Sequence, residues 1–311
     1  MKKILLVLAA TLAATVALDA QDMAQATETY NNGAMALQTG DEAAALEHFQ
    51  ASLTMAEACG EEGAEMVANC KEYIPKIMLS IAKASIKDGA YDKGLGEIEA
   101  AIAKANEYGA TSVVEDATEL IPQVKMYKAN DLLNNKDFAG AIEAYKDIVA
   151  GQPDNATALL RLGLAYSRVD DLANAETAYL AAAENGQEKA AKSQLGNLFL
   201  KEAQTALKAQ KTADAYDYAI KSFDYSGNKN AIYLAGMAAQ KLGKDDKAIE
   251  AFEQFLAVGA NDKRADDVKC TLAVIAQKAG DKTKALEYYK QILTNPKYTE
   301  VAKAQIAALG K

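Results

Sequence analysis

The sequence repeats one short pattern at a regular distance, and this repeat constrains the fold more than any other feature. Ala141 is followed four residues later by Tyr145, and one 34-residue period further on Ala175 is followed by Tyr179. Residues four apart lie on the same face of a helix, so each pair brings a small and a large side chain together. A period of this length indicates stacked helix–turn–helix units, each of which buries its apolar face against the next.

Comparable pairs mark the second helix of about seven successive units. In each pair the small residue allows the two helices of a unit to approach closely, and the residue that follows fills the space between units. The predicted pairs are Ala45 and Phe49, Gly94 and Ile98, Ala141 and Tyr145, Ala175 and Tyr179, Ala215 and Ala219, Ala248 and Phe252, and Ala285 and Tyr289. The composition agrees, since the chain has only 4 prolines and is rich in alanine, the best helix former.

The first units are longer than the later ones. Ile74-Pro75 and Ile121-Pro122 stand 47 residues apart, so the second and third units are predicted to share an extension of the first helix. A proline inside a helix kinks or breaks it, and we favour a kinked long helix over a break with a separate short helix. Extended repeats are predicted over about residues 24–149 and more regular repeats over about 155–293. A last helix over 299–309, capped by Thr299, is expected to cover the end of the array.

The stretch from Asn155 to Gly186 carries the fullest version of the pattern. It places Leu162-Gly163, Tyr166, Ala175, Tyr179 and Ala182 in register, and Pro153 closes the unit before it. In these features the mature chain resembles a tetratricopeptide repeat (TPR) protein over essentially its whole length. The resemblance implies an all-α fold, a right-handed α-solenoid of about seven helix–turn–helix repeats with a C-terminal capping helix. The departures from the family are the long early spacings, Gly94 in place of alanine and the lack of tryptophan.

In this family the first helices line the inner face of the superhelix, which commonly binds peptides or proteins. The groove-facing positions carried onto this sequence are Met126, Asn130 and Leu133; Leu160, Leu164 and Arg168; Leu200, Gln204 and Leu207; Tyr233, Met237 and Lys241; and Cys270, Val274 and Lys278. Such a partly apolar groove suits an amphipathic helix or an extended peptide, and for each residue the alternative is packing between helices. One subfamily clamps a C-terminal carboxylate with a lysine and an asparagine four residues apart. The corresponding pairs here lack the lysine, so no clamp of that type is expected.

Residues 1–20 have the features of a signal peptide. Two lysines precede an apolar run from Ile4 to Leu18 that is short for a bilayer span, and Ala20 is a small residue suited to cleavage. The alternative is a buried N-terminal helix. Signal removal predicts that residues 21–311 are exported, most simply to a bacterial periplasm, with no membrane insertion afterwards. The formal net charge of −9 argues against nucleic acid and anionic membranes as main partners.

The three cysteines offer one candidate disulfide. Cys59 and Cys70 flank a loop that is expected to join two antiparallel helices, so they are predicted to pair in an oxidising compartment. In the chain-entropy model a ring of this size adds roughly 2–3 kcal/mol of stability. The alternative is a pair of half-buried thiols. Cys270 is the odd cysteine and is assigned to packing.

No arrangement of residues in the sequence points to catalysis, a cofactor or a metal. The single histidine, His48, has no nucleophile or set of soft ligands at a useful spacing, and no glycine-rich phosphate loop follows a strand. The leading expectation is a non-enzymatic scaffold or adaptor that binds a protein or peptide in the bacterial cell envelope. The alternatives are a periplasmic module that binds a glycan or small molecule and a self-assembling structural protein. The oligomeric state is left open.

Overall fold

The computed structural model describes residues 22–310, and the expected signal peptide over residues 1–20 lies outside them. Within the described residues the chain is helical, with no strand. It divides into two compact units, of which the first ends at Ile148 and the second begins at Val149. Each unit is described by itself below.

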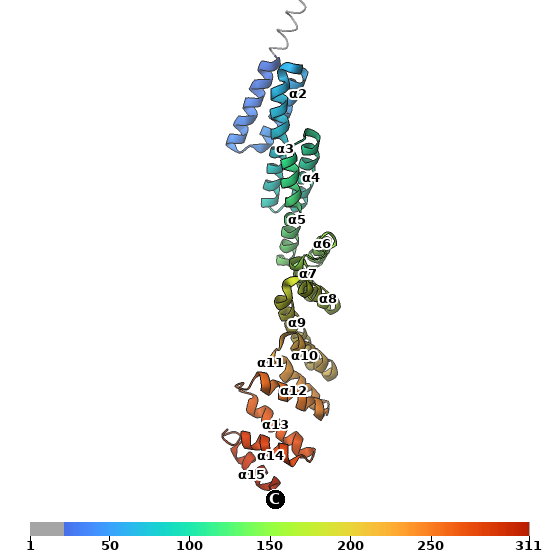
Figure 1. Ribbon diagram of the computed structural model, residues 1–311, viewed down its shortest axis with the longest axis vertical. Helices are drawn as coiled ribbons and strands as arrows, with labels where there is room; N and C mark the ends of the chain where they lie inside the picture. The colour runs from blue at the N-terminus through green and yellow to red at the C-terminus, as the bar shows by residue number, and fades with distance from the viewer. Residues whose placement is uncertain (1–21, 311) are drawn as a thin grey trace, which may run out of the picture. The chain divides into compact units, whose positions relative to one another are not determined.

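The first unit is built from long helices. After a helix that includes residues 22–39, the elements are α2 (Glu42–Ala58), a short 3-10 turn (Gly60–Gly63), α3 (Ala64–Lys87), α4 (Tyr91–Tyr108), α5 (Thr111–Asn134) and α6 (Phe138–Gly151), within which the unit ends (Figure 1). Helix α3 packs against α2 and α4, and α5 packs against α4. Both α3 and α5 continue through an internal proline, Pro75 and Pro122, which confirms one long helix rather than a break in each.

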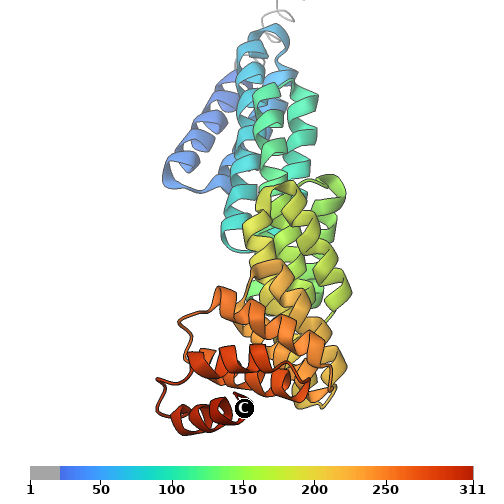
Figure 2. The ribbon, with the colours of Figure 1, turned by 60° about the horizontal axis from the view of Figure 1, so that its bottom comes forward.

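The second unit is a series of helix pairs closed by a single helix. Its elements are α7 (Ala156–Arg168), α8 (Leu172–Ala182), a π-helical segment (Ala183–Gln187), α9 (Glu188–Lys208), α10 (Thr212–Ser226), α11 (Lys229–Lys241), α12 (Asp245–Val258), α13 (Ala265–Lys278), α14 (Lys282–Gln291) and α15 (Thr299–Leu309). Four pairs pack side by side: α7 with α8, α9 with α10, α11 with α12, and α13 with α14. Figure 2 shows the last pairs and α15 in orange and red.

The predicted small and large pairs form the interior of these units. All seven pairs lie in the second helix of their helix–turn–helix repeat, and both members of every pair are buried. The first helix comes so close that a Cβ added to Gly163 would lie 2.7 Å from the Tyr179 ring, and one added to Gly236 would lie 2.5 Å from the Phe252 ring. The repeat in the sequence is therefore a repeat of helix contacts, and the all-α array of TPR-like helix pairs is confirmed.

In the fifth repeat, formed by α9 and α10, the two helices come equally close through a polar contact. Its pair, Ala215 and Ala219, has no aromatic member, and both residues are fully buried. One turn further on, the buried hydroxyl of Ser222 donates to the carbonyl oxygen of Gly196 at 2.6 Å. A Cβ on Gly196 would lie 2.2 Å from Oγ of Ser226, so glycine permits this contact between α9 and α10.

Helix α15 covers the end of the second unit. Ala302 is fully buried in a cluster with Tyr289 and Ile292. The prediction that Thr299 caps this helix is wrong, because the cap is Tyr298 and makes no side-chain capping hydrogen bond. The Thr299 hydroxyl instead donates to the carbonyl oxygen of Leu293 at 2.9 Å, which ties the helix start to the preceding turn.

Replacement of Gly163 by alanine is expected to lower the free energy of unfolding by about 1–3 kcal/mol, because the new methyl group displaces the Tyr179 ring. Urea unfolding followed by circular dichroism measures the change. The control is Gly96→Ala in α4, where an added Cβ meets nothing within 4 Å. That variant is expected to gain up to about 1 kcal/mol from helix propensity. Equal stability of Gly163→Ala and wild type would contradict the proposed packing.

The turn inside each later helix pair contains one residue in the left-handed region. Glycine occupies this place at Gly243 and Gly280, with φ of 69° and 82°. Asp170 and Gln210 occupy the equivalent place with φ of 57° and 60°, a conformation that disfavours a side chain. These turns therefore carry backbone strain that the glycine turns do not.

The Gln210→Gly variant is expected to be more stable than wild type by about 1 kcal/mol, because relief of left-handed strain outweighs the added entropy of the unfolded chain. The reciprocal variant, Gly243→Gln, is expected to lose a similar amount. Thermal unfolding of the two proteins in parallel tests the pair. A lower melting temperature for Gln210→Gly would show that the glutamine side chain makes a compensating contact.

Candidate functional site

The candidate site lies on the first helices of the second unit. Helix α7 contacts α9, and α9 contacts α11. Helix α13 follows through a shared buried cluster that contains Ile232 of α11 and Leu272 of α13. The exposed and half-buried side chains of α7, α9, α11 and α13 are called here the first-helix face. Each repeat of the second unit thus contributes its first helix to this surface.

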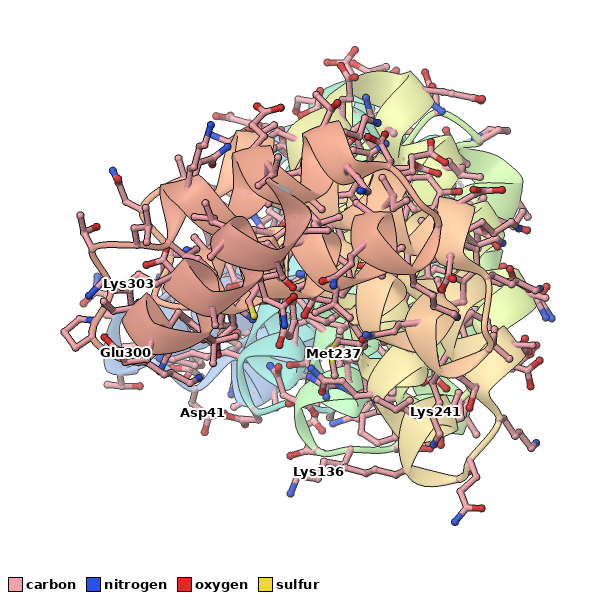
Figure 3. All side chains as sticks on the ribbon, turned by 90° about the horizontal axis from the view of Figure 1, so that it is seen from below. Asp41, Lys136, Met237, Lys241, Glu300 and Lys303 are labelled. Carbon is pink, nitrogen blue, oxygen red and sulfur yellow. The ribbon has the colours of Figure 1, made fainter. Side chains whose placement is uncertain are left out.

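Some predicted groove residues are accessible on this face. Arg168, Gln204, Met237, Lys241, Val274 and Lys278 are exposed. Met237 and Val274 are large apolar residues, and their exposed fractions are 42% and 52%. Figure 3 labels Met237 and Lys241 on α11. The face thus combines exposed apolar side chains with exposed cations.

Other predicted residues belong partly to the interior. Leu160, Leu164 and Tyr233 are half-buried and pack against the core of the second unit. Leu200 and Leu207 are also half-buried. These five side chains are only partly exposed to solvent, so we assign them to the floor of the face rather than to its rim. Their part in binding stays a prediction.

The three predicted positions of the first unit are engaged within that unit. Leu133 is only 7% exposed, which corresponds to the alternative of packing between helices. Asn130 accepts a hydrogen bond from the Tyr145 hydroxyl at 2.6 Å, which occupies its amide oxygen. Met126 is half-buried. All the predicted groove residues that are exposed therefore lie in the second unit.

Tyr233 is held in place by a residue that sequence reasoning missed. The Arg264 guanidinium lies 4.5 Å from the centre of the Tyr233 ring, and its Nη2 donates to Asn230 Oδ1 at 2.8 Å. Asp262 fixes the guanidinium through its carboxylate, 2.8 Å from Nε. Hydrogen bonds from Arg264 and Lys229 hold the pKa of Asp262 well below its usual range. The spacing of an acid and an arginine two residues apart, in the long α12–α13 loop, was the available signal.

A small hollow opens between α7 and α9. Its volume is about 190 Å³, and its lining includes Leu164, Ser167 and Arg168 from α7 and Gln194, Asn197 and Lys201 from α9. Sequence reasoning found only Leu164 and Arg168 of these residues. Leu200, Gln204 and Leu207 of α9 were predicted, but Gln194, Asn197 and Lys201 lie at other positions of that helix and were missed.

The ionic contacts of this hollow are exposed. Lys201 Nζ lies 2.9 Å from Oδ1 of Asp170, and their side chains are 59% and 75% exposed. The hydrogen bond to Asp170 raises the pKa of Lys201, whereas desolvation and the nearby Arg168 charge lower it. Burial raises the pKa of Tyr179 in the wall, against the effect of a hydrogen bond with Ser167 and of the Arg168 charge. Arg168 and Lys201 are therefore the two cations that line this hollow.

A larger hollow in the first unit is bounded by internal ion pairs. It has a volume of about 520 Å³ and lies among α4, α5 and α6, with Leu95 and Leu132 in its lining. Lys125 pairs with Asp147 at 2.7 Å, and Lys128 pairs with Asp92 at 2.5 Å. Each cation of this lining is thus paired with an acid of the same lining, and the third acid, Glu143, pairs with Lys146 at 3.0 Å.

The predicted disulfide residues lie near each other in sequence but in different settings. Cys59 is the C-cap of α2 and its Sγ donates to the carbonyl oxygen of Met55 at 3.3 Å, whereas Cys70 is fully buried in α3. Burial raises the pKa of the Cys70 thiol. The disulfide stays a prediction.

Neither a metal centre nor a membrane span stands out in the part of the chain that the structure describes. Across residues 22–310, acidic, histidine and cysteine side chains nowhere gather in groups of three that could hold a metal ion. In the same range no helix has both the length and the hydropathy needed to cross a bilayer.

Comparison with known proteins identifies the repeats. The family model of the tetratricopeptide repeat matches residues 128–193 and 233–299. No protein with a curated description matches the sequence. These two matched spans contain the buried pairs at Ala141, Ala175, Ala248 and Ala285.

Several solved structures resemble the chain weakly. MamA is 21% identical, with 56% of this chain and 91% of that chain covered and a TM-score of 0.35. YrrB, described as a TPR protein with an unusual peptide-binding site, is 21% identical, with 62% and 95% covered and a TM-score of 0.34. The C-terminal part of a TPR repeat-containing protein from Cytophaga hutchinsonii is 16% identical, with 89% and 99% covered and a TM-score of 0.36. The family match, together with the buried repeat pairs, identifies tetratricopeptide repeats in this chain over residues 128–193 and 233–299.

Proposed function

We propose that this protein is a non-enzymatic scaffold that binds a protein or peptide on the first-helix face of its second unit. The observation that carries the proposal is the exposure of Met237 and Val274, 42% and 52%, on neighbouring first helices. Large apolar side chains grouped on a repeat surface favour burial against a partner. The half-buried Leu164 and Tyr233 extend the same surface, with a smaller fraction of each side chain exposed.

The surroundings of these apolar residues indicate the form of the partner. Exposed Lys241 and Lys278 end the same two helices, four residues after Met237 and Val274. An amphipathic helix or an extended peptide buries apolar side chains against such a floor and keeps its polar side chains at the rim. Arg264 supports this floor, because its stacking on Tyr233 fixes the ring before a partner arrives.

The double variant Met237→Glu and Val274→Glu is expected to lose its partner, because two carboxylates replace the apolar contacts. The matched control is Leu180→Glu and Val258→Glu, which places the same charges on exposed apolar positions of second helices. Each tagged protein is incubated with envelope extract, and captured proteins are quantified by mass spectrometry. Circular dichroism melting shows that both variants are folded. Equal capture by both double variants would contradict binding on the first-helix face.

The proposed location is the bacterial cell envelope, most simply the periplasm. The support comes from the sequence of residues 1–20, with its lysines and apolar run, and from the acidic charge of the remainder. A periplasm is oxidising, so the same location favours the Cys59–Cys70 disulfide.

Intact mass spectrometry tests the location and the disulfide on one sample. Protein isolated from the periplasmic fraction of its own organism is expected to begin at Gln21. Without reductant, alkylation is expected to label Cys270 alone, and the pair Cys59 and Cys70 is expected to be two hydrogens lighter than the dithiol. A chain that retains Met1 in the cytoplasmic fraction would contradict export. Alkylation of all three cysteines would contradict the disulfide independently.

A further inference from the structure

The larger hollow, in the first unit, lies on a different face of α5 from the predicted groove. Lys125, Lys128 and Leu132 line it and recur every three or four residues, so they share one face of that helix. Met126 and Asn130 of the predicted groove belong to another face, because consecutive helical residues are turned by about 100°. The rest of the lining comes from the second helices α4 and α6. The hollow is therefore separate from the surface that the repeat pattern assigns to binding.

The lining includes an apolar part. Leu95 from α4, Leu132 from α5 and Ala144 from α6 are only partly exposed, so we assign them to the floor. Leu95 also packs against the buried core of the first unit, which fixes its position. The volume of about 520 Å³ lies within the roughly 300–1,000 Å³ of sites that enclose small molecules. The floor can therefore take the apolar side chain of a small ligand.

Opposite charges accompany this floor in the lining. Lys125 Nζ lies 2.7 Å from Oδ2 of Asp147 on α6, and Lys128 Nζ lies 2.5 Å from Oδ1 of Asp92 on α4. Glu143, one turn before Asp147, adds a third carboxylate. The two second helices thus bring acids to a row of two lysines on the first helix between them in sequence.

This mixture disfavours ligands that carry charge of one sign. A simple anion that approaches the lysines meets three carboxylates in the same lining, and a simple cation meets two ammonium groups. A dipolar molecule can place its carboxylate on a lysine and its ammonium group on an acid, so one ion pair is replaced by two. The side chains of Lys125 and Asp147 are 39% and 63% exposed, and exposed pairs contribute little to stability. Separating them therefore costs little.

We propose that this hollow binds a small zwitterion with an apolar side chain, either a free amino acid or a dipeptide. The ligand carboxylate contacts Lys125 and Lys128, and the ligand ammonium group contacts Asp147. The apolar side chain of the ligand lies on Leu95 and Leu132. This site is additional to the proposed binding of a protein or peptide on the first-helix face and does not depend on it.

Titration of the purified protein with leucyl-leucine, followed by NMR, tests the site. The methyl signals of Leu95 and Leu132 are expected to shift in a saturable manner. N-acetyl-leucyl-leucine lacks the cation, leucyl-leucine amide lacks the anion, and glycyl-glycine lacks the apolar side chains. Each of these three is expected to bind about tenfold more weakly. A parallel titration with leucine distinguishes a free amino acid from a dipeptide.

Two outcomes of these titrations overturn the site. One is the absence of a saturable shift with both leucine and leucyl-leucine. The other is binding of any of the three altered compounds as tightly as leucyl-leucine, because the site requires both charges and the apolar side chain together.

A lysine variant connects the preference to the hollow. The double variant Lys125→Met and Lys128→Met is expected to lose the preference for leucyl-leucine over its amide, because no cation is left for the carboxylate. The matched control is Lys282→Met and Lys290→Met, which removes two exposed lysines from α14 and is expected to keep the preference. Circular dichroism melting shows that both variants are folded. Retention of the preference in the first variant, or its loss in the control, overturns the site.

Two further variants test the acidic side and the independence of the site. Glu143→Gln with Asp147→Asn is expected to lose the preference over the N-acetyl compound while keeping the preference over the amide. Met237→Glu with Val274→Glu is expected to bind leucyl-leucine as wild type does. Loss of leucyl-leucine binding in this variant would place the ligand on the first-helix face and overturn the hollow. Failure of protein capture with dipeptide binding intact would contradict the proposed function alone.

Discussion

Close contact between the two helices of a unit is the constraint on which the rest of the structure depends. Gly163 faces the ring of Tyr179, and Gly236 faces the ring of Phe252, at distances that leave no room for a methyl group. The aromatic ring fills the volume that glycine leaves, so apolar area is buried without a cavity. The exposed side of each first helix then has a fixed orientation, and side chains one turn apart on neighbouring helices can act on one ligand.

Much of the fold was predictable because its signal is local and periodic. The pair Ala175 and Tyr179 needs only helical spacing to be recognised, and the single helices through Pro75 and Pro122 follow from their surrounding pattern. The role of Thr299 was not predictable, because a helix cap depends on the path of the turn before it. The hydroxyl found a carbonyl in that turn instead of an amide at the helix start.

The candidate site was predictable only where the repeat pattern extends to it. Met237 and Val274 were found because they occupy pattern positions on regular helices. Lys201 and Gln194 were missed although Leu200 and Gln204 of the same helix were predicted, since the hollow requires two helices to be placed side by side. Asn130 was found but its amide oxygen is occupied by Tyr145, a contact that depends on the distance between two helices.

The turn at Asp170 has a consequence for the hollow between α7 and α9. The Asp170 carboxylate lies 2.9 Å from Lys201 Nζ, and the turn after α7 carries it to that lysine on α9. Because the chain itself holds this carboxylate nearby, its effective concentration at Lys201 is high. Free anions from solution therefore compete for Lys201 at a disadvantage, and the turn lowers the affinity of the hollow for small acids.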